Sequence, residues 1–262
     1  MKSKNIGDKD LKDAVNISNY HYGNQEKAGS RTIKMLIEND GGKRINKKKI
    51  LRIKIKYNLK TKIRKSKTSS KNQARNQQEN KVFPNILARN FERSRPDEVY
   101  VTDITQLNYG RSKKAFLAVF KDLCTKEIVS YELSKRSDIQ LVDIALEKAI
   151  KRLSNEAKSK LMIHSDQGFQ FTSKVYSEKL KKFGITQSMS RRGNCYDNAS
   201  VESFFGHFKD WLDIDRCETF EKLNEIVERE MNFYNNVRPQ WSLNKKPPRL
   251  YRGLVLNNLR LF

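Results

Sequence analysis

Apolar residues recur with different periods at the two ends of the chain. Between residues 30 and 58 they recur at helical spacing, on a segment that begins near Ser30 and stops at Gly41 and on a second that begins near Asn46. Lysines and arginines fill most positions between the apolar residues of the second segment. Two helices joined by a tight glycine turn, the second strongly basic, are typical of a helix-turn-helix-like DNA-binding unit. Residues 1–29 lack a clear period and predict a short helix or disorder.

A polar stretch separates these helices from the rest of the chain. Residues 61–81 are rich in Lys, Ser, Asn and Gln and carry almost no large apolar side chain, which is the composition of an extended linker. We expect this linker to run along DNA. Apolar anchors return over 82–96. We therefore predict three parts, which are a basic helix-turn-helix-like region over 1–70, a basic linker over 71–96 and an α/β domain over 97–256.

The third part alternates strand and helix patterns. Its first three predicted strands are separated by short loops, as antiparallel neighbours are. The order of three strands followed by alternating helices and strands is that of a ribonuclease-H-like fold, with a mixed five-stranded sheet and flanking helices. The predicted strands span 99–105, 115–121, 128–133, 161–164 and 185–190, and the predicted helices span 138–153, 173–183, 198–212 and 219–236.

Three carboxylates lie where the predicted elements would bring them together. Asp103 lies in the first strand, Asp166 follows the fourth, and Glu202 lies near the start of a helix, with 35 residues between the last two. If the two strands are neighbours, their carboxylates converge, and the helix must cross the same edge of the sheet. Such a set holds divalent cations, and two of them roughly 3.5 to 4 Å apart serve in-line attack at a phosphodiester. A single Asp or Glu is usually structural, so the interpretation depends on all three.

Polar residues near these carboxylates are candidates for supporting roles. Lys209 lies seven residues after Glu202 and therefore on the same face of the helix, where it can reach a DNA phosphate. His164 could order the metal site from behind, or could simply be satisfied by backbone. The loop before the helix carries groups that suit DNA contacts, and the alternative is a flexible loop without a ligand. The candidates in this loop are Arg191, Arg192, Asn194 and Asn198.

Aromatic and basic residues also cluster after the last predicted helix. They suit base stacking or phosphate contact, and they could equally close the core. We expect Trp241 to pack. The cluster consists of Tyr234, Asn235, Arg238 and Trp241.

Positive charge is concentrated in the N-terminal part. The chain carries 54 Lys and Arg against 30 Asp and Glu, a net charge of +24, and residues 1–96 hold 26 of the basic residues against 8 acidic ones. Residues 43–71 hold 14 basic residues and no acidic one. Nucleic acid is the expected partner, because a membrane surface would call for an amphipathic stretch with bulky apolar residues. A merely solvated basic tail is the alternative. The expected DNA contacts here are Lys47, Lys48, Lys49 and Arg52.

Cysteine usage and hydropathy exclude several classes. The three cysteines have no Cys-x-x-Cys spacing and only three histidines accompany them, so neither a zinc site nor a disulfide framework is indicated. Residues 1–13 lack the apolar segment of a signal peptide, and no run approaches roughly 18 apolar residues. We therefore expect a cytoplasmic protein with reduced cysteines.

In combination, these motifs closely resemble the transposase of IS3-family insertion sequences, specifically its second reading frame product. The resemblance covers most of the chain and depends on the three carboxylates, on their 35-residue spacing and on Lys209. Further matching segments are 29–34, 46–59, 82–85, 100–105, 164–168, 190–209, 234–238 and 248–252.

The resemblance implies an integrase catalytic core over 97–256 that cuts the ends of a mobile element and joins the exposed 3′ hydroxyl to another DNA strand. Its metal ligands would be Asp103, Asp166 and Glu202, and its cofactor would be Mg²⁺ or Mn²⁺, as two ions. Its partners would be the terminal inverted repeats of the element and target DNA, bound by a homo-oligomer in a bacterial cytoplasm. Members of this family are usually active as a frameshift fusion, so a need for the upstream-frame product is also implied.

Other classes remain open at this point. Among enzymes, the alternatives are a retroviral-type integrase and a plain nuclease. Retroviral-type integrases carry a His and Cys zinc module, which His21, His164 and His207 cannot build. Outside enzymes, the alternatives are a non-catalytic DNA-binding regulator and an inactive transposase fragment.

Overall fold

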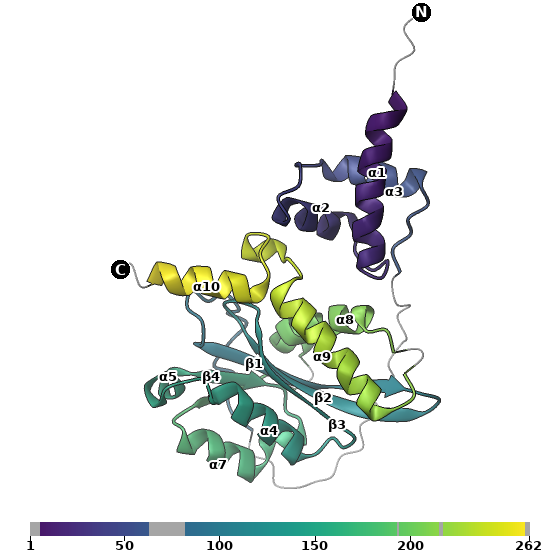
Figure 1. Ribbon diagram of the computed structural model, residues 1–262. Helices are drawn as coiled ribbons and strands as arrows, with labels where there is room; N and C mark the ends of the chain where they lie inside the picture. The colour runs from purple at the N-terminus through teal and green to yellow at the C-terminus, as the bar shows by residue number, and fades with distance from the viewer. Residues whose placement is uncertain (1–5, 63–81, 193, 215–216, 260–262) are drawn as a thin grey trace, which may run out of the picture. The chain divides into compact units, whose positions relative to one another are not determined.

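The chain forms two compact units (Figure 1). The computed structural model describes residues 6–62, 82–192, 194–214 and 217–259, and the side chains of 6–9 and Cys195 are not described. The first unit comprises residues 1–69 and 236–247, and the second comprises 70–235 and 248–262. Residues 236–247 therefore group with the N-terminal helices, whereas the sequence placed them in the α/β domain. The first part of the predicted linker, residues 71–81, lies outside the described residues.

The described residues of the first unit form three α-helices, α1 (Ile6–Gly23), α2 (Ser30–Asn39) and α3 (Lys47–Lys56). The two helices predicted from periodicity are present. Helix α1 is longer than expected, because its buried positions hold one large aliphatic side chain, Ile17, among Asp10, Ala14 and His21, while Leu11 and Val15 face outward. The buried stripe has helical spacing but few apolar residues, which explains why residues 1–29 show no clear apolar period. The fully buried side chains of α2 and α3 are Ile33, Ile37, Ile50 and Ile53.

Local backbone chemistry sets the ends of α2 and α3. The N-cap of α2 is Gly29 rather than Ser30, which is the first residue of the helix. Gly41 ends α2 in the left-handed region at φ +75°, and the N–H of the next residue donates to the carbonyl of Ile37 at 2.9 Å. Asn46 caps α3, since its side chain accepts a hydrogen bond from the backbone N–H of Lys48 at 2.9 Å.

The second unit is built on one mixed sheet. Its strands are β1 (Val99–Tyr109), β2 (Lys113–Asp122), β3 (Ile128–Ser134), β4 (Met162–Ser165) and β5 (Thr186–Met189). Their order is β3-β2-β1-β4-β5, with β1, β2 and β3 antiparallel and with β4 and β5 parallel to β1. This arrangement confirms the predicted ribonuclease-H-like fold with a mixed five-stranded sheet.

Helices cover both faces of the sheet. The helices predicted from the sequence are α4 (Ile139–Ile150), α7 (Lys174–Lys182), α8 (Ala199–Trp211) and α9 (Phe220–Asn236). Shorter or unexpected ones are α5 (Asn155–Lys160), α6 (Phe169–Thr172) and α10 (Pro248–Leu259), together with the 3-10 turns η1 (Cys195–Asn198) and η2 (Trp241–Leu243). Within the described ranges, no helix has both the length and the apolar character needed to cross a membrane.

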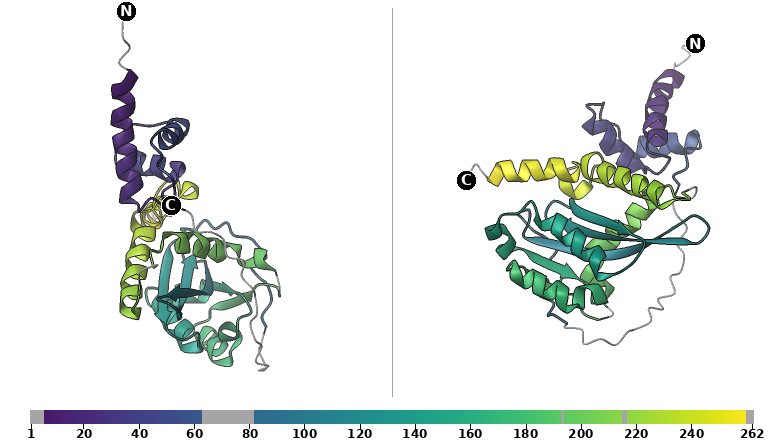
Figure 2. Two further views of the ribbon diagram at one scale, coloured as in Figure 1. Left: turned by 90° about the vertical axis from the view of Figure 1, so that its right-hand side faces the viewer. Right: turned by 60° about the horizontal axis from the view of Figure 1, so that its bottom comes forward.

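Alternation along β1 assigns its residues to two hydrophobic clusters. Val99, Val101 and Leu107 pack in the cluster that includes the aromatic side chains of α8, whereas Tyr100 packs in the cluster under α4 and α7. Figures 1 and 2 show α8 and α9 on one face of the sheet and α4 and α7 on the other. Because side chains alternate along a strand, Asp103 falls on the face that α8 covers.

Candidate active site

Parallel pairing of β1 with β4 places Asp103 beside Asp166. The paired residues are Val99 with Met162, Tyr100 with Ile163 and Val101 with His164. Continuing the same register by two residues sets Asp103 level with Asp166, which directly follows β4. Neighbouring strands lie about 4.8 Å apart, and residues level with one another in a parallel pair point to the same face. Both carboxylates therefore lie on the face of the sheet that α8 covers.

Short local hydrogen bonds orient both carboxylates. The backbone N–H of Ile104 donates to Oδ1 of Asp103 at 2.7 Å, and the N–H of Gly168 donates to Oδ1 of Asp166 at 2.9 Å. A Cβ atom on Gly168 would lie 3.0 Å from that same Oδ1 and 3.2 Å from Oε1 of Gln170. The Asp-Gln-Gly motif thus has a physical reason, because a side chain at its third position would crowd the carboxylate it serves.

Electrostatics show that the predicted site residues act on one another. Burial, together with the negative charges of Asp166 and Glu202, raises the pKa of Asp103 to about 8. The backbone N–H of Ile104 and the ammonium of Lys209 oppose the shift. A carboxyl with so high a pKa lacks a full counter-charge, which a bound cation would provide.

Helix α8 carries Glu202 on its first turn and Lys209 on its last. Buried aromatic residues anchor the helix, and the ring of Phe204 lies 5.3 Å from that of Phe208 and 4.8 Å from that of Tyr234. From β2, the buried ammonium of Lys121 donates to the Ser200 carbonyl at 2.8 Å and thereby fixes the start of the helix. Glu202 itself is exposed.

The site offers two adjacent carboxylates and a third at its margin. Among the described residues, no three Asp, Glu, His or Cys side chains already form a group that could hold a metal ion. Asp103 and Asp166 nevertheless fit a hard divalent cation, because Mg²⁺ commonly takes one or two protein carboxylates and completes its shell with water and phosphate. The repulsion between these two carboxylates also favours a bound cation.

His164 is in β4, two residues before Asp166, and its side chain is fully buried on the same face of the sheet. Its Nδ1 is 2.9 Å from Oγ of Ser188, and its Nε2 is 3.0 Å from the carbonyl oxygen of Asp197. The Ser188 oxygen already accepts the N–H groups of Ile86 and Leu87 at 3.0 and 3.1 Å, so its own hydrogen goes to Nδ1. Nε2–H then donates to the carbonyl. Burial lowers the pKa of His164, which is therefore neutral.

Asp197 is a functional candidate that the sequence did not single out. Its carboxylate is fully buried and joins the segment of Asn85 and Arg89 to the loop after β5. The Arg191 side chain holds the pKa of this carboxyl well below its usual range, and Arg89 lowers it further. An acidic residue in a loop that carries two arginines was the available signal. The donors to Asp197 are Asn85 Nδ2 at 2.9 Å, Arg89 Nε at 2.7 Å, and Arg191 N, Nε and Nη2 at 3.1, 3.0 and 3.2 Å.

The predicted DNA contacts around this loop differ in their surroundings. Arg191 is engaged with Asp197, although its side chain remains 61% exposed. Arg192 is exposed. Asn198 is buried at 3% exposure and its Oδ1 lacks a hydrogen-bond partner among the described residues, so its side chain is not available to DNA in this structure. Trp241, which we expected to pack, is 58% exposed.

The four predicted DNA contacts on α3 fall into two pairs with different surroundings. Lys47 and Lys48 are exposed. Arg52 instead bonds both carboxylate oxygens of Asp10 in α1, at 2.8 and 3.0 Å, and Lys49 pairs with Asp13 of the same helix. Half of the predicted contact set therefore joins α3 to α1.

Comparison with known proteins defines the class of the second unit. Two family models described as integrase core domain match residues 93–195 and 183–248. The chain also resembles a chain of the simian T-cell lymphotropic virus intasome, solved in complex with the PP2A regulatory subunit B56 gamma, with a TM-score of 0.50 and 14% identity over 90% of this chain and 74% of the other. The second unit is thus an integrase core.

Relatives in bacteria narrow the class to a family. The chain is 34% identical to the putative transposase InsK for insertion sequence element IS150 of Escherichia coli, over 90% of this chain and 81% of that protein. It is 35% identical to an uncharacterized transposase-like protein of Haemophilus influenzae, over 82% of this chain and 96% of that protein. The chain belongs to the insertion-sequence transposases with an integrase core, as the sequence motifs predicted.

The raised pKa of Asp103 predicts a pH-dependent stability in metal-free protein. The folded carboxyl keeps its proton up to about pH 8, whereas the unfolded one loses it near pH 4, so the unfolded state binds fewer protons between these values. Stability should therefore fall as pH rises from 4 towards 8, and added Mn²⁺ should restore it. Thermal melts of wild type and Asp103→Asn test this, since the variant should lose this pH-dependent contribution and the Mn²⁺ response. A wild-type Mn²⁺ response retained in full by Asp103→Asn would contradict the assignment.

The buried carboxylate of Asp197 predicts a stability effect of defined size. Replacing it with Ala leaves Arg89, Arg191 and Asn85 without their acceptor, and we expect the melting temperature to fall by about 5 °C. Differential scanning calorimetry measures this shift. Asp213→Ala, at an exposed position, is the matched control and should change little. An unchanged melting temperature for Asp197→Ala would show that the network carries no net stability.

Proposed function

We propose that this transposase catalyses metal-dependent cleavage at the ends of an insertion sequence and joins the freed 3′ hydroxyl to target DNA. The adjacency of Asp103 and Asp166 in an integrase core is the observation that supports this most directly. In this proposal both residues and Glu202 hold the cations, and they are the catalytic residues. The reaction class is polynucleotidyl transfer.

The cofactor in this proposal is Mg²⁺ or Mn²⁺, as two ions. When bound, such a pair activates the attacking oxygen and stabilises the leaving oxygen of an in-line displacement. The task of the chain is to present three carboxylates to the cations and to exclude competing protons. The N–H groups of Ile104 and Gly168 orient the two aspartates for this task. Glu202 completes the set from the exposed first turn of α8.

The same helix gives the site a surface for DNA. Glu202, Gly206 and Lys209 share one face of α8, and a Cβ atom on Gly206 would meet nothing within 4 Å. In our proposal a strand lies along this face, with Lys209 near a phosphate and Gly206 leaving room for the backbone. His164 is then a positioning residue, because its hydrogen bonds tie β4 to η1 immediately before α8.

The partners in this proposal are the terminal inverted repeats and target DNA, bound by a homo-oligomer. The upstream-frame product, or fusion to it, is the further partner, because the family resemblance implies it. Arg191, Arg192, Lys47 and Lys48 remain proposed DNA contacts. The alternative is a non-catalytic DNA-binding regulator or an inactive transposase fragment, which would bind element ends without cutting them.

Conservative removal of each carboxylate tests the catalytic proposal. Asp103→Asn, Asp166→Asn and Glu202→Gln should each lower cleavage and joining of labelled element ends by more than about a hundredfold, because a metal ligand is lost. Binding to the same DNA should persist. The assay uses the full chain, alone and fused to its upstream partner, with Mg²⁺ or Mn²⁺. Full activity in all three variants would reject the metal ligands, and a wild type that binds but never cuts would favour the regulator.

The two pairs on α3 predict separable effects. Lys48→Ala should reduce the salt dependence of DNA binding by about one phosphate contact and leave the melting temperature unchanged. Arg52→Ala should lower the melting temperature by about 2 °C, because it removes the bond to Asp10 in α1. Fluorescence anisotropy across a salt series and thermal melts measure both quantities. Equal salt slopes for wild type and Lys48→Ala would remove Lys48 from the DNA interface.

A further inference from the structure

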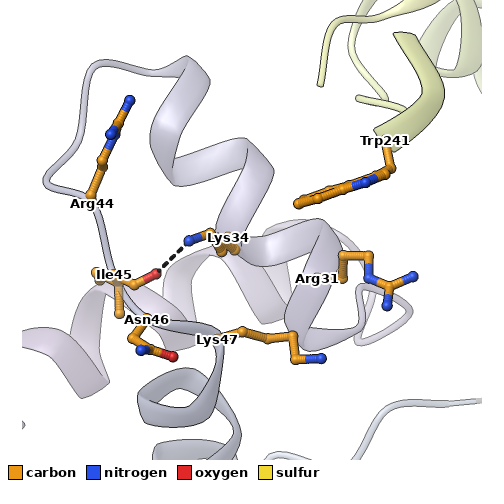
Figure 3. A pocket seen from close by; sticks show the side chains of 7 residues that line it. All are labelled: Arg31, Lys34, Arg44, Ile45, Asn46, Lys47 and Trp241. Carbon is orange, nitrogen blue, oxygen red and sulfur yellow. Dashed lines mark hydrogen bonds between the residues drawn. The ribbon is translucent and has the colours of Figure 1, made fainter. Parts of the chain in front are cut away.

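The first unit contains a pocket whose chemistry the proposed active site does not use. Its volume is about 570 Å³, within the range of small-ligand sites. Four cationic side chains and one indole ring line it, and no carboxylate does. Figure 3 shows the ring entering from residues 236–247, while the cations come from α2, the α2–α3 connection and the start of α3. The lining residues used in the argument are Arg31, Lys34, Arg44, Lys47 and Trp241.

The cations of this pocket differ in whether they already have a counter-charge. Lys34 lies 3.2 Å from Glu38 and also donates to the Ile45 carbonyl. Across the part of the chain that the structure describes, Arg31, Arg44 and Lys47 lack a carboxylate within ion-pair distance. Their repulsion is uncompensated, which an anionic ligand would relieve. A phosphate satisfies this requirement and matches the donors of both Arg and Lys.

Trp241 lies on a loop that is held in place, and yet its side chain remains exposed. It starts η2, and the loop around it is closed by the bridge between Gln240 and Lys246. Lys245 then fixes this loop to α2, since its ammonium lies 2.8 Å from Glu38 and its carbonyl accepts from Asn39 at 2.7 Å. With 58% of its surface exposed, the indole keeps a large apolar area uncovered on a fixed support.

The indole also lies among cations. The guanidinium carbon of Arg31 is 5.9 Å from the ring centroid, and Nζ of Lys245 is 5.4 Å from it. These contacts stabilise the side chains around the ring. Aromatic rings beside basic side chains are the means by which proteins bind single strands, because the base stacks while the cations take the phosphates.

We infer that this pocket binds an unpaired nucleotide of a DNA strand. The base stacks on Trp241, and Arg44 and Lys47 contact its flanking phosphates. Cations alone would serve a duplex equally well, but the base faces inside a duplex are covered by their neighbours, so the open indole selects for an unpaired or terminal base. The inference deepens the proposed function, on which it rests, by assigning a site for a strand end in the first unit.

The test measures binding of a short 5′-phosphorylated single strand and of the blunt duplex of the same sequence to the full chain. The protein has two tryptophans, and Trp211 stacks on Phe233 at 4.9 Å, so quenching by the strand should come from Trp241. Trp241→Leu should abolish the quenching. By anisotropy of a labelled strand, it should also weaken binding by about five- to a hundredfold.

A charge-reversal variant gives the second arm. Arg44→Glu combined with Lys47→Glu should weaken strand binding at least about tenfold, and Lys182→Glu, at an exposed position in the second unit, should not. Circular dichroism checks that each variant folds. Equal quenching by strand and duplex would overturn the inference, as would wild-type strand affinity in Trp241→Leu.

The two proposals fail in distinguishable ways. Asp103→Asn should quench with the single strand as the wild type does, because the pocket holds none of the proposed metal ligands. Strand binding in a protein that never joins DNA would reject the catalytic proposal and keep the pocket. Joining by Trp241→Leu at the wild-type rate, together with unchanged strand affinity, would reject the pocket and keep the catalytic proposal.

Discussion

The parallel pairing of β1 with β4 is the constraint on which the proposed active site depends. A register fixed by three residue pairs sets Asp103 level with Asp166 and makes two like charges neighbours. Without a cation this arrangement is unfavourable, because burial and then the charge of Asp166 raise the pKa of Asp103. The sheet tolerates it because the surrounding residues of β1 are buried between two hydrophobic clusters, so the register cannot slip without turning Val101 and Tyr100 to the wrong faces.

A second constraint connects this edge of the sheet to α8. The Asp197 carboxylate and carbonyl together bind Asn85, Arg89, Arg191 and His164, which belong to the segment before β1, the loop after β5 and β4 itself. A buried carboxylate that accepts hydrogen bonds from two guanidiniums is fully compensated, in contrast to Asp103, whose pKa is raised. The scaffold therefore holds Asp197 ionised and neutralised and leaves Asp103 short of positive charge.

Periodicity predicted the sheet and the major helices of the core, because each is a local pattern, and the three carboxylates were proposed from short motifs. It failed where the determinant was a distant partner. Helix α1 was underestimated because its buried stripe holds Asp10 and His21, and the charge of Asp10 is compensated only in the folded chain, by Arg52, Lys49 and Lys56 of α3. The sequence could not identify Asp197 as the partner of Arg191, because their ion pair depends on the folded conformation of the loop. The exposure of Trp241 follows from a loop whose anchor, Glu38, lies roughly two hundred residues away.

Partners that are distant in sequence also limit what the net charge predicts about DNA binding. The basic excess predicted a polyanion, but the structure divides the lysines and arginines by their neighbours. Lys49 and Arg52 are neutralised by carboxylates of α1 and thereby hold two helices together, whereas Lys34 pairs with Glu38 within α2. Arg31, Arg44 and Lys47, which have no compensating carboxylate among the described residues, line the pocket that contains the open ring of Trp241. Because a nucleic acid competes poorly for a cation that already has a buried partner, the uncompensated subset marks the binding surface better than the total charge does.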